Sequence, residues 1–125
     1  ADLEGRCDVV LVDAPCSGSG TWRRNPEGRW RLNHDPLDRL VELQARLLDL
    51  AAPLLKPGGA LVYATCSIIR AEGAAQARNF LGRHSSWIVQ DMPFEGGRED
   101  GPGRLLTPAH DATDGFFVAR FAKPC

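Results

Sequence analysis

Two cysteines are the residues of this chain whose type and placement best suit covalent chemistry. Cys16 and Cys66 each directly follow a short apolar segment that is typical of a β-strand. The thiolate form of cysteine is a strong nucleophile. The reference pKa of the thiol is about 8.5, and a helix N-terminus after the loop favours the thiolate form. Either cysteine alone is more simply explained as a small buried residue at a strand end. The presence of two cysteines at corresponding strand ends favours a shared function.

The segments around these cysteines predict an α/β chain. Strands joined through a crossover helix run parallel, and their carboxyl ends meet at one edge, where ligands bind in open α/β sheets. We therefore expect Cys16 and Cys66 at the same edge. The final two strands, joined without a helix, could be antiparallel. The pattern predicts a strand buried on both faces at 7–13 and a second apolar strand at 60–65, with helices at 36–53 and 70–82. It also predicts short strands at 87–90 and 116–121 and a long loop at 91–113.

Composition narrows the class of protein. The chain has 125 residues, of which 43% are hydrophobic and 25% charged, as in one ordinary globular domain. No apolar run approaches the roughly 20 residues that cross a bilayer, and no secretory signal opens the chain. We expect a cytoplasmic protein with reduced thiols, no membrane partner and no metal, because the cysteines and histidines lack metal-ligand spacing. Because the chain begins with Ala1, we expect it to be cut from something longer.

One local patch carries positive charge, although the formal net charge of the chain is only −1. Residues 22–31 hold four arginines and two tryptophans against a single glutamate. Arginine beside aromatic faces suits phosphate contact and base stacking, as in proteins that bind single-stranded RNA. A solvated loop whose tryptophans pack inward explains the same composition equally well.

Three motifs, in order along the chain, resemble the Nop/Sun family of RNA cytosine-5 methyltransferases, most strongly its bacterial ribosomal RNA members. They lie at residues 13–30, 56–68 and 113–119. The Pro-Cys-Ser and Thr-Cys-Ser pair is specific, whereas Pro-Gly-Gly before a strand is common to many methyltransferases. The resemblance implies the C-terminal half of a Rossmann-like class I S-adenosylmethionine-dependent methyltransferase fold, with parallel strands and a terminal antiparallel strand. One departure is Gly73, where many members have asparagine after the glutamate.

The resemblance also implies roles for individual residues. Cys66 would attack carbon-6 of cytosine, which makes carbon-5 electron-rich enough to take a methyl group from S-adenosylmethionine. Cys16 would assist release of the methylated base. Asp13 would contact the ring edge of the cytosine, and Asp13 and Pro15 would border the cofactor. Covalent addition of this kind divides one difficult step into easier ones.

The substrate implied by the resemblance is RNA, most simply ribosomal RNA, held by Arg23, Arg24, Arg29 and Trp30. The glycine-rich cofactor turn and the catalytic lysine of the family have no counterpart in this chain. We therefore expect residues 1–125 to be the C-terminal part of a catalytic domain without its cofactor-binding N-terminal half. Alone, this part should be inactive, bind S-adenosylmethionine poorly and associate with itself through an unpaired sheet edge.

Two other functions remain open at this stage. The first is a non-catalytic RNA-binding module that retains the fold. The second is a cysteine hydrolase that pairs one thiol with a histidine, although His34, His84 and His110 are all expected in loops or at helix ends. We expect His84 in particular to lie at a solvated helix end.

Overall fold

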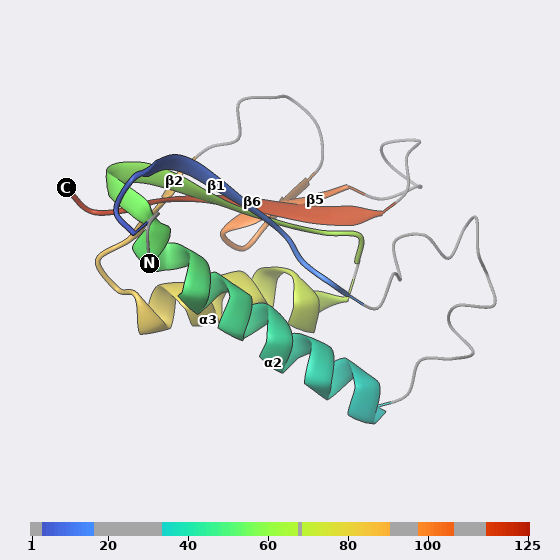
Figure 1. The fold of residues 1–125 in the computed structure, drawn as a ribbon. Helices are drawn as coiled ribbons and strands as arrows, with labels where there is room; N and C mark the ends of the chain where they lie inside the picture. The colour runs from blue at the N-terminus through green and yellow to red at the C-terminus, as the bar shows by residue number, and fades with distance from the viewer. Residues whose placement is uncertain (1–3, 17–33, 68, 91–97, 107–114) are drawn as a thin grey trace.

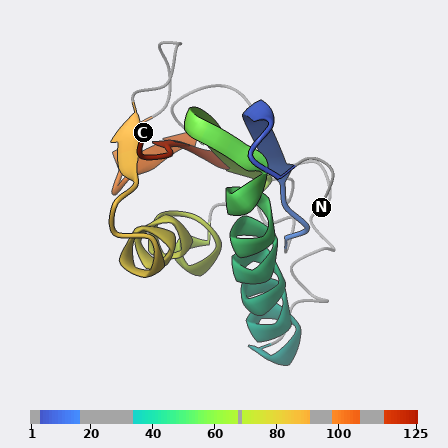
Figure 2. The same ribbon diagram turned by 60° about the vertical axis from the view of Figure 1, so that its left-hand side comes forward.

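The fold is one β-sheet with two helices packed against one of its faces (Figures 1 and 2). The computed structural model describes residues 4–16, 34–67, 69–90, 98–106 and 115–125. The strands are β1 (Cys7–Asp13), β2 (Leu55–Thr65), β3 (Ile88–Gln90), β4 (Arg98–Asp100), β5 (Gly103–Leu106) and β6 (Phe116–Ala122). The helices are α2 (His34–Ala51) and α3 (Ala74–Arg83), with the 3-10 turns η2 (Ala52–Leu54) and η3 (Arg70–Glu72). The described strands follow the order β1-β2-β6-β5-β4, and β3 also pairs with β6.

Strands β1 and β2 are neighbours and run parallel, as predicted, from the pair Val9–Ala60 to the pair Asp13–Ala64. The prediction that β1 is buried on both faces is wrong, because Val9 and Leu11 are 58% and 63% exposed. The described sheet places β1 at an edge, so one long side of its backbone has no strand beside it there. The expectation of an unpaired sheet edge is therefore confirmed for the part of the chain that the structure describes.

The start of β2 has a backbone geometry that accounts for its two glycines, Gly58 and Gly59. The helix predicted at 36–53 spans His34–Ala51, and residues 56–59 form an irregular start to β2, opposite a register shift in β1. Gly58 has a positive φ of 82°, which glycine adopts without steric cost. A Cβ at Gly59 would lie 2.9 to 3.1 Å from three backbone oxygens, so a side chain there would push the two strands apart.

Both helices pack their regularly spaced apolar residues against the sheet. Leu48 on α2 and Phe80 on α3 are fully buried in one core with Leu61, Phe117 and Phe121 of the sheet. The predicted helix at 70–82 is divided in the structure. Residues 70–72 form η3, Gly73 separates it from α3, and α3 continues to Arg83. The division leaves room for Phe117, because a Cβ at Gly73 would lie 2.9 Å from its ring.

The predicted loop at 91–113 contains two strands. Strands β4 and β5 form an antiparallel hairpin across Gly101, which has a positive φ of 56°, and β5 then pairs with β6. The last strand is antiparallel to β3, as the absence of a connecting helix suggested, and it is also antiparallel to β2. No helix among the residues described is long and apolar enough to cross a membrane.

Candidate functional site

The carboxyl ends of β1 and β2 form the edge at which the two candidate cysteines lie. Asp13 pairs with Ala64, and the next amide, that of Ala14, donates to the carbonyl of Ala64 at 3.0 Å. Cys16 and Cys66 both follow within three residues of this last pair. The structure confirms that the two cysteine loops leave neighbouring parallel strands at the same edge.

The two thiols differ in exposure and in the face they continue. Cys66 is exposed and Cys16 is half-buried. In the pleat, Cys16 continues the alternation of Val12, which belongs to the core under the helices, whereas Cys66 continues that of Ala64 on the opposite face. Both cysteines lie beyond the ladder, where the pleat no longer sets the direction of a side chain.

Tyr63, near the end of β2, links this edge to the turn after it. Its hydroxyl donates to the backbone carbonyl of Glu72 at 2.6 Å and is fully buried. Burial raises the pKa of Tyr63 far above its usual value, and the Glu72 carboxylate and the Cys16 thiol add to the shift. The hydroxyl therefore stays neutral and serves as a donor.

Glu72, the last residue of η3, is a fully buried carboxylate. Its two oxygens accept from the hydroxyl of Ser67 at 2.5 Å and from the side-chain amide of Gln44 at 2.9 Å. The Ser67 oxygen also accepts from the amide of Ile69 at 3.0 Å. A buried carboxylate is tolerated when donors of this kind replace water.

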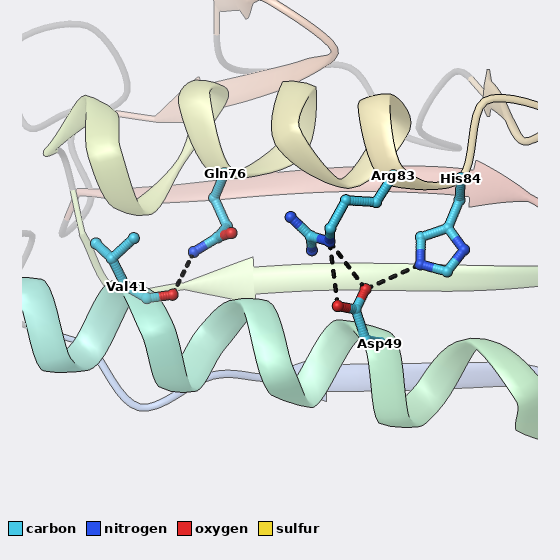
Figure 3. A network of polar contacts seen from close by, with 5 residues as sticks. All are labelled: Val41, Asp49, Gln76, Arg83 and His84. Atoms are coloured by element: carbon cyan, nitrogen blue, oxygen red, sulfur yellow. Dashed lines mark hydrogen bonds and ion pairs between the residues drawn. The ribbon is translucent and has the colours of Figure 1, made fainter.

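Gln44 carries the network across to the other cysteine loop. Its Nε2 donates to Glu72 and also to the carbonyl of Pro15 at 2.9 Å, while its Oε1 accepts from Gln76 at 3.2 Å. Gln76 in turn donates to the carbonyl of Val41 at 2.9 Å, which Figure 3 shows between α3 and α2. The network therefore joins both helices to both cysteine loops.

Sequence reasoning did not single out these polar residues as part of the site. One signal was available for Gln44, which occupies a position in the apolar spacing of the first helix, where a polar side chain needs a buried partner. Glu72 was noted only for the residue after it. Its partners come from segments 5 and 28 residues away in sequence, and no local pattern identifies them.

The structure describes some of the other predicted site residues and not others. Asp13 and Pro15 are exposed at the cysteine edge. Beside Asp13, a groove of about 330 Å³ runs between β1 and α2, lined mainly by leucines, among them Leu11, Leu47 and Leu50. The RNA-binding candidates Arg23, Arg24, Arg29 and Trp30 lie outside the described residues.

His84 is not at a solvated helix end, and that expectation is corrected. It is half-buried, stacks on Phe80 with ring centroids 4.5 Å apart, and contacts Asp49 at 2.9 Å. Arg83 donates to both oxygens of the same carboxylate at 3.1 Å (Figure 3). His84 directly follows α3, whose ten residues separate it from Glu72 by about 15 Å. Its described contacts pair it with Asp49 and give no support to a cysteine hydrolase.

Comparisons with known proteins match this arrangement. Residues 2–122 fit the family model described as 16S rRNA methyltransferase RsmB/F. The chain is 42% identical over 121 residues to ribosomal RNA small subunit methyltransferase B of Pectobacterium carotovorum, an alignment that covers 96% of this chain and 27% of that protein. The chain therefore spans about a quarter of the length of the curated relatives it matches.

Solved structures show the same fold. The structure titled "Crystal Structure of PH0851" superposes with a TM-score of 0.87 at 42% identity, over 96% of this chain and 27% of that one. NSun6 from Pyrococcus horikoshii, solved with SFG, superposes with a TM-score of 0.78 at 22% identity, over 90% and 29%. The mixed sheet is thus that of the class I S-adenosylmethionine-dependent methyltransferases. Within that class, the chain belongs to the 16S rRNA methyltransferase RsmB/F family.

Proposed function

We propose that the protein containing this chain methylates carbon-5 of cytosine in ribosomal RNA, in the cytoplasm, through a covalent cysteine adduct. The observation that carries the proposal is the placement of Cys16 and Cys66 just after the last paired residues of two adjacent parallel strands. Family membership supports the substrate class, because the matching family is described by its action on 16S ribosomal RNA.

In the proposed reaction, the Cys66 thiolate adds to carbon-6 of the base. Its exposure at the sheet edge leaves room for a pyrimidine to approach. The new carbon–sulfur bond sends the electron pair of the 5,6 double bond to carbon-5, which then takes the methyl group. Cys16, as thiolate, accepts the proton from carbon-5. The electron pair of that carbon–hydrogen bond restores the double bond and expels the Cys66 thiolate.

Asp13 is proposed to contact the ring edge of the cytosine as the adduct forms. A carboxylate there can hold a proton at the ring nitrogen and so stabilise the electron-rich adduct. The exposure of Asp13 at the end of β1 is consistent with this contact. Both thiols must reach one base for the scheme to work.

S-adenosylmethionine would supply the methyl group. Asp13 and Pro15 are the proposed contacts from this chain, and the apolar groove beside Asp13 can take part of a flat, weakly polar group. A relative of the same fold was solved with SFG, an analogue of this cofactor. We propose that residues 1–125 form the C-terminal part of the catalytic domain and that most cofactor contacts come from the N-terminal part. Arg23, Arg24, Arg29 and Trp30 are proposed to contact the RNA.

Cysteine variants of the complete protein test this proposal. Cys66→Ala should abolish methylation while RNA binding is retained, because the adduct can no longer form. Cys16→Ser should instead accumulate a covalent RNA–protein adduct, visible as a shifted band in a denaturing gel. Cys125→Ser, an exposed thiol after β6, is the matched control and should change neither readout. Methylation by the Cys66→Ala variant, or no adduct with Cys16→Ser, would overturn the two-thiol scheme.

A further inference from the structure

The buried carboxylate of Glu72 has a partner set that leads to both cysteines. Its Oε1 accepts from Ser67, the residue after Cys66, and its Oε2 accepts from Gln44. Gln44 donates its second amide hydrogen to the carbonyl of Pro15, the residue before Cys16. One carboxylate therefore connects the two cysteine loops through two separate arms.

The orientation of Gln44 in this chain of contacts is determined by its neighbours. A glutamine amide offers two hydrogens and one oxygen acceptor. Both hydrogens are used, toward Glu72 and Pro15, and the oxygen accepts from Gln76. A flipped amide would place its oxygen against two acceptors, so the observed orientation is the one that the network permits.

Hydrogen bonds from residues outside the two arms also hold them in place. Tyr63 donates to the backbone carbonyl of Glu72, and the amide of Ile69 donates to Ser67. Glu72, Gln44, Ser67 and Tyr63 are all fully buried, so water does not compete for these bonds. A satisfied buried network of this kind holds its members in one geometry.

We propose that Glu72 and Gln44 are positioning residues that set the spacing between the two cysteine loops. The inference rests on the proposed function, because two thiols that act on one base must be held at a fixed separation. The Ser67 arm positions Cys66 for addition to carbon-6, and the Gln44–Pro15 arm positions Cys16 for removal of the proton from carbon-5. Glu72 joins the arms without contacting the base.

Variants that break one arm at a time should have different effects on the covalent adduct. In the complete protein, Gln44→Leu removes the Pro15 arm and should slow turnover by about tenfold or more, since misplacement of a reacting group by an ångström is costly. The adduct should accumulate, as in Cys16→Ser. Ser67→Ala removes the other arm and should slow turnover to a similar extent, but with no more adduct than the unaltered protein forms.

A stability control distinguishes positioning from loss of fold. Lys123 donates to the carbonyls of Ala52 and Leu55, at the start of β2, far along the strand from Cys66. Lys123→Met removes two part-buried contacts without touching either arm, and should lower the melting temperature while leaving both turnover and the adduct fraction unchanged. If Gln44→Leu and Ser67→Ala both raise the adduct fraction, or if either lowers the melting temperature without slowing turnover, as Lys123→Met should, the positioning role is wrong.

Alkylation rates keep this test separate from the reaction scheme. Iodoacetamide labelling, read by peptide mass spectrometry with Cys125 as internal reference, should change at Cys16 in Gln44→Leu and at Cys66 in Ser67→Ala. Unchanged rates at both sites would overturn the positioning role even if methylation depends on both thiols. If Cys66→Ala still methylates RNA, the proposed function fails, and the alkylation rates alone decide the positioning role.

Discussion

The glycine between η3 and α3 should not tolerate a side chain. A Cβ at Gly73 would lie 2.9 Å from Cγ and 3.1 Å from Cδ1 of Phe117, whose ring is fully buried. Overpacking of this kind costs about 1–3 kcal/mol. The restriction of the unfolded chain offsets about 0.4–1 kcal/mol of it. Gly73→Ala should therefore lower the free energy of unfolding by about 1–2 kcal/mol.

The assay is urea unfolding followed by circular dichroism, at fixed protein concentration. Gly82→Ala is the matched control, because it makes the same change within α3 at a position with no atom within 4 Å of the added Cβ. It should be neutral or stabilising by up to about 1 kcal/mol, since alanine is the better helix former. The contrast between the two glycines separates the effect of the Phe117 contact from the general effect of adding a methyl group to the chain.

A double variant identifies the contact responsible. Phe117→Leu shortens the ring that the new methyl group meets, so it should recover part of the cost of Gly73→Ala, with a coupling energy of about 0.5–3 kcal/mol. Additive effects, or a Gly73→Ala variant as stable as Gly82→Ala, would refute the packing argument.

Two further predictions concern the isolated chain. Expressed alone, residues 1–125 should self-associate through β1 and show no tight S-adenosylmethionine binding by calorimetry; Leu11→Lys should shift light scattering toward monomer, and an unchanged mass would exclude this edge. Tyr63 is the single tyrosine, and its raised pKa means that the folded chain keeps a proton that the unfolded chain releases near pH 10. The free energy of unfolding is therefore unaffected by this group below about pH 10 and decreases as the pH rises further. Tyrosinate absorbance should therefore appear only with alkaline unfolding; its appearance in the folded chain would contradict the burial argument.

The elements that the sequence predicts well are those with long, regular patterns. Strand β1 and helix α2 were predicted because valines and leucines recur there over many residues. The β4–β5 hairpin was missed because its strands have three and four residues, and Gly101 and Gly103 make the segment resemble a loop. Its strand geometry depends on pairing with β6, which no local pattern reveals.

The candidate site was predictable only in part, for a related reason. Strand ends are local features, so Cys16 and Cys66 could be placed at one edge from the order of the elements alone. The bonds of Glu72 to Gln44 and of Gln44 to Pro15 depend on how α2 packs across the sheet. Exposure of β1 likewise depends on its place in the sheet, and hydrophobic residues alone could not distinguish an edge strand from a central one.

The position of β6 in the sheet has a consequence for synthesis on the ribosome. This strand is the last of the chain's described strands, yet it lies in the middle of the sheet, with β2 along one side and β5 and β3 along the other. The β1-α2-β2 unit can form early from neighbouring residues, but its inner side waits for residues 116–122 to emerge. A nascent chain paused before that point would expose Tyr63 and Leu61, and would be a ready target for chaperones.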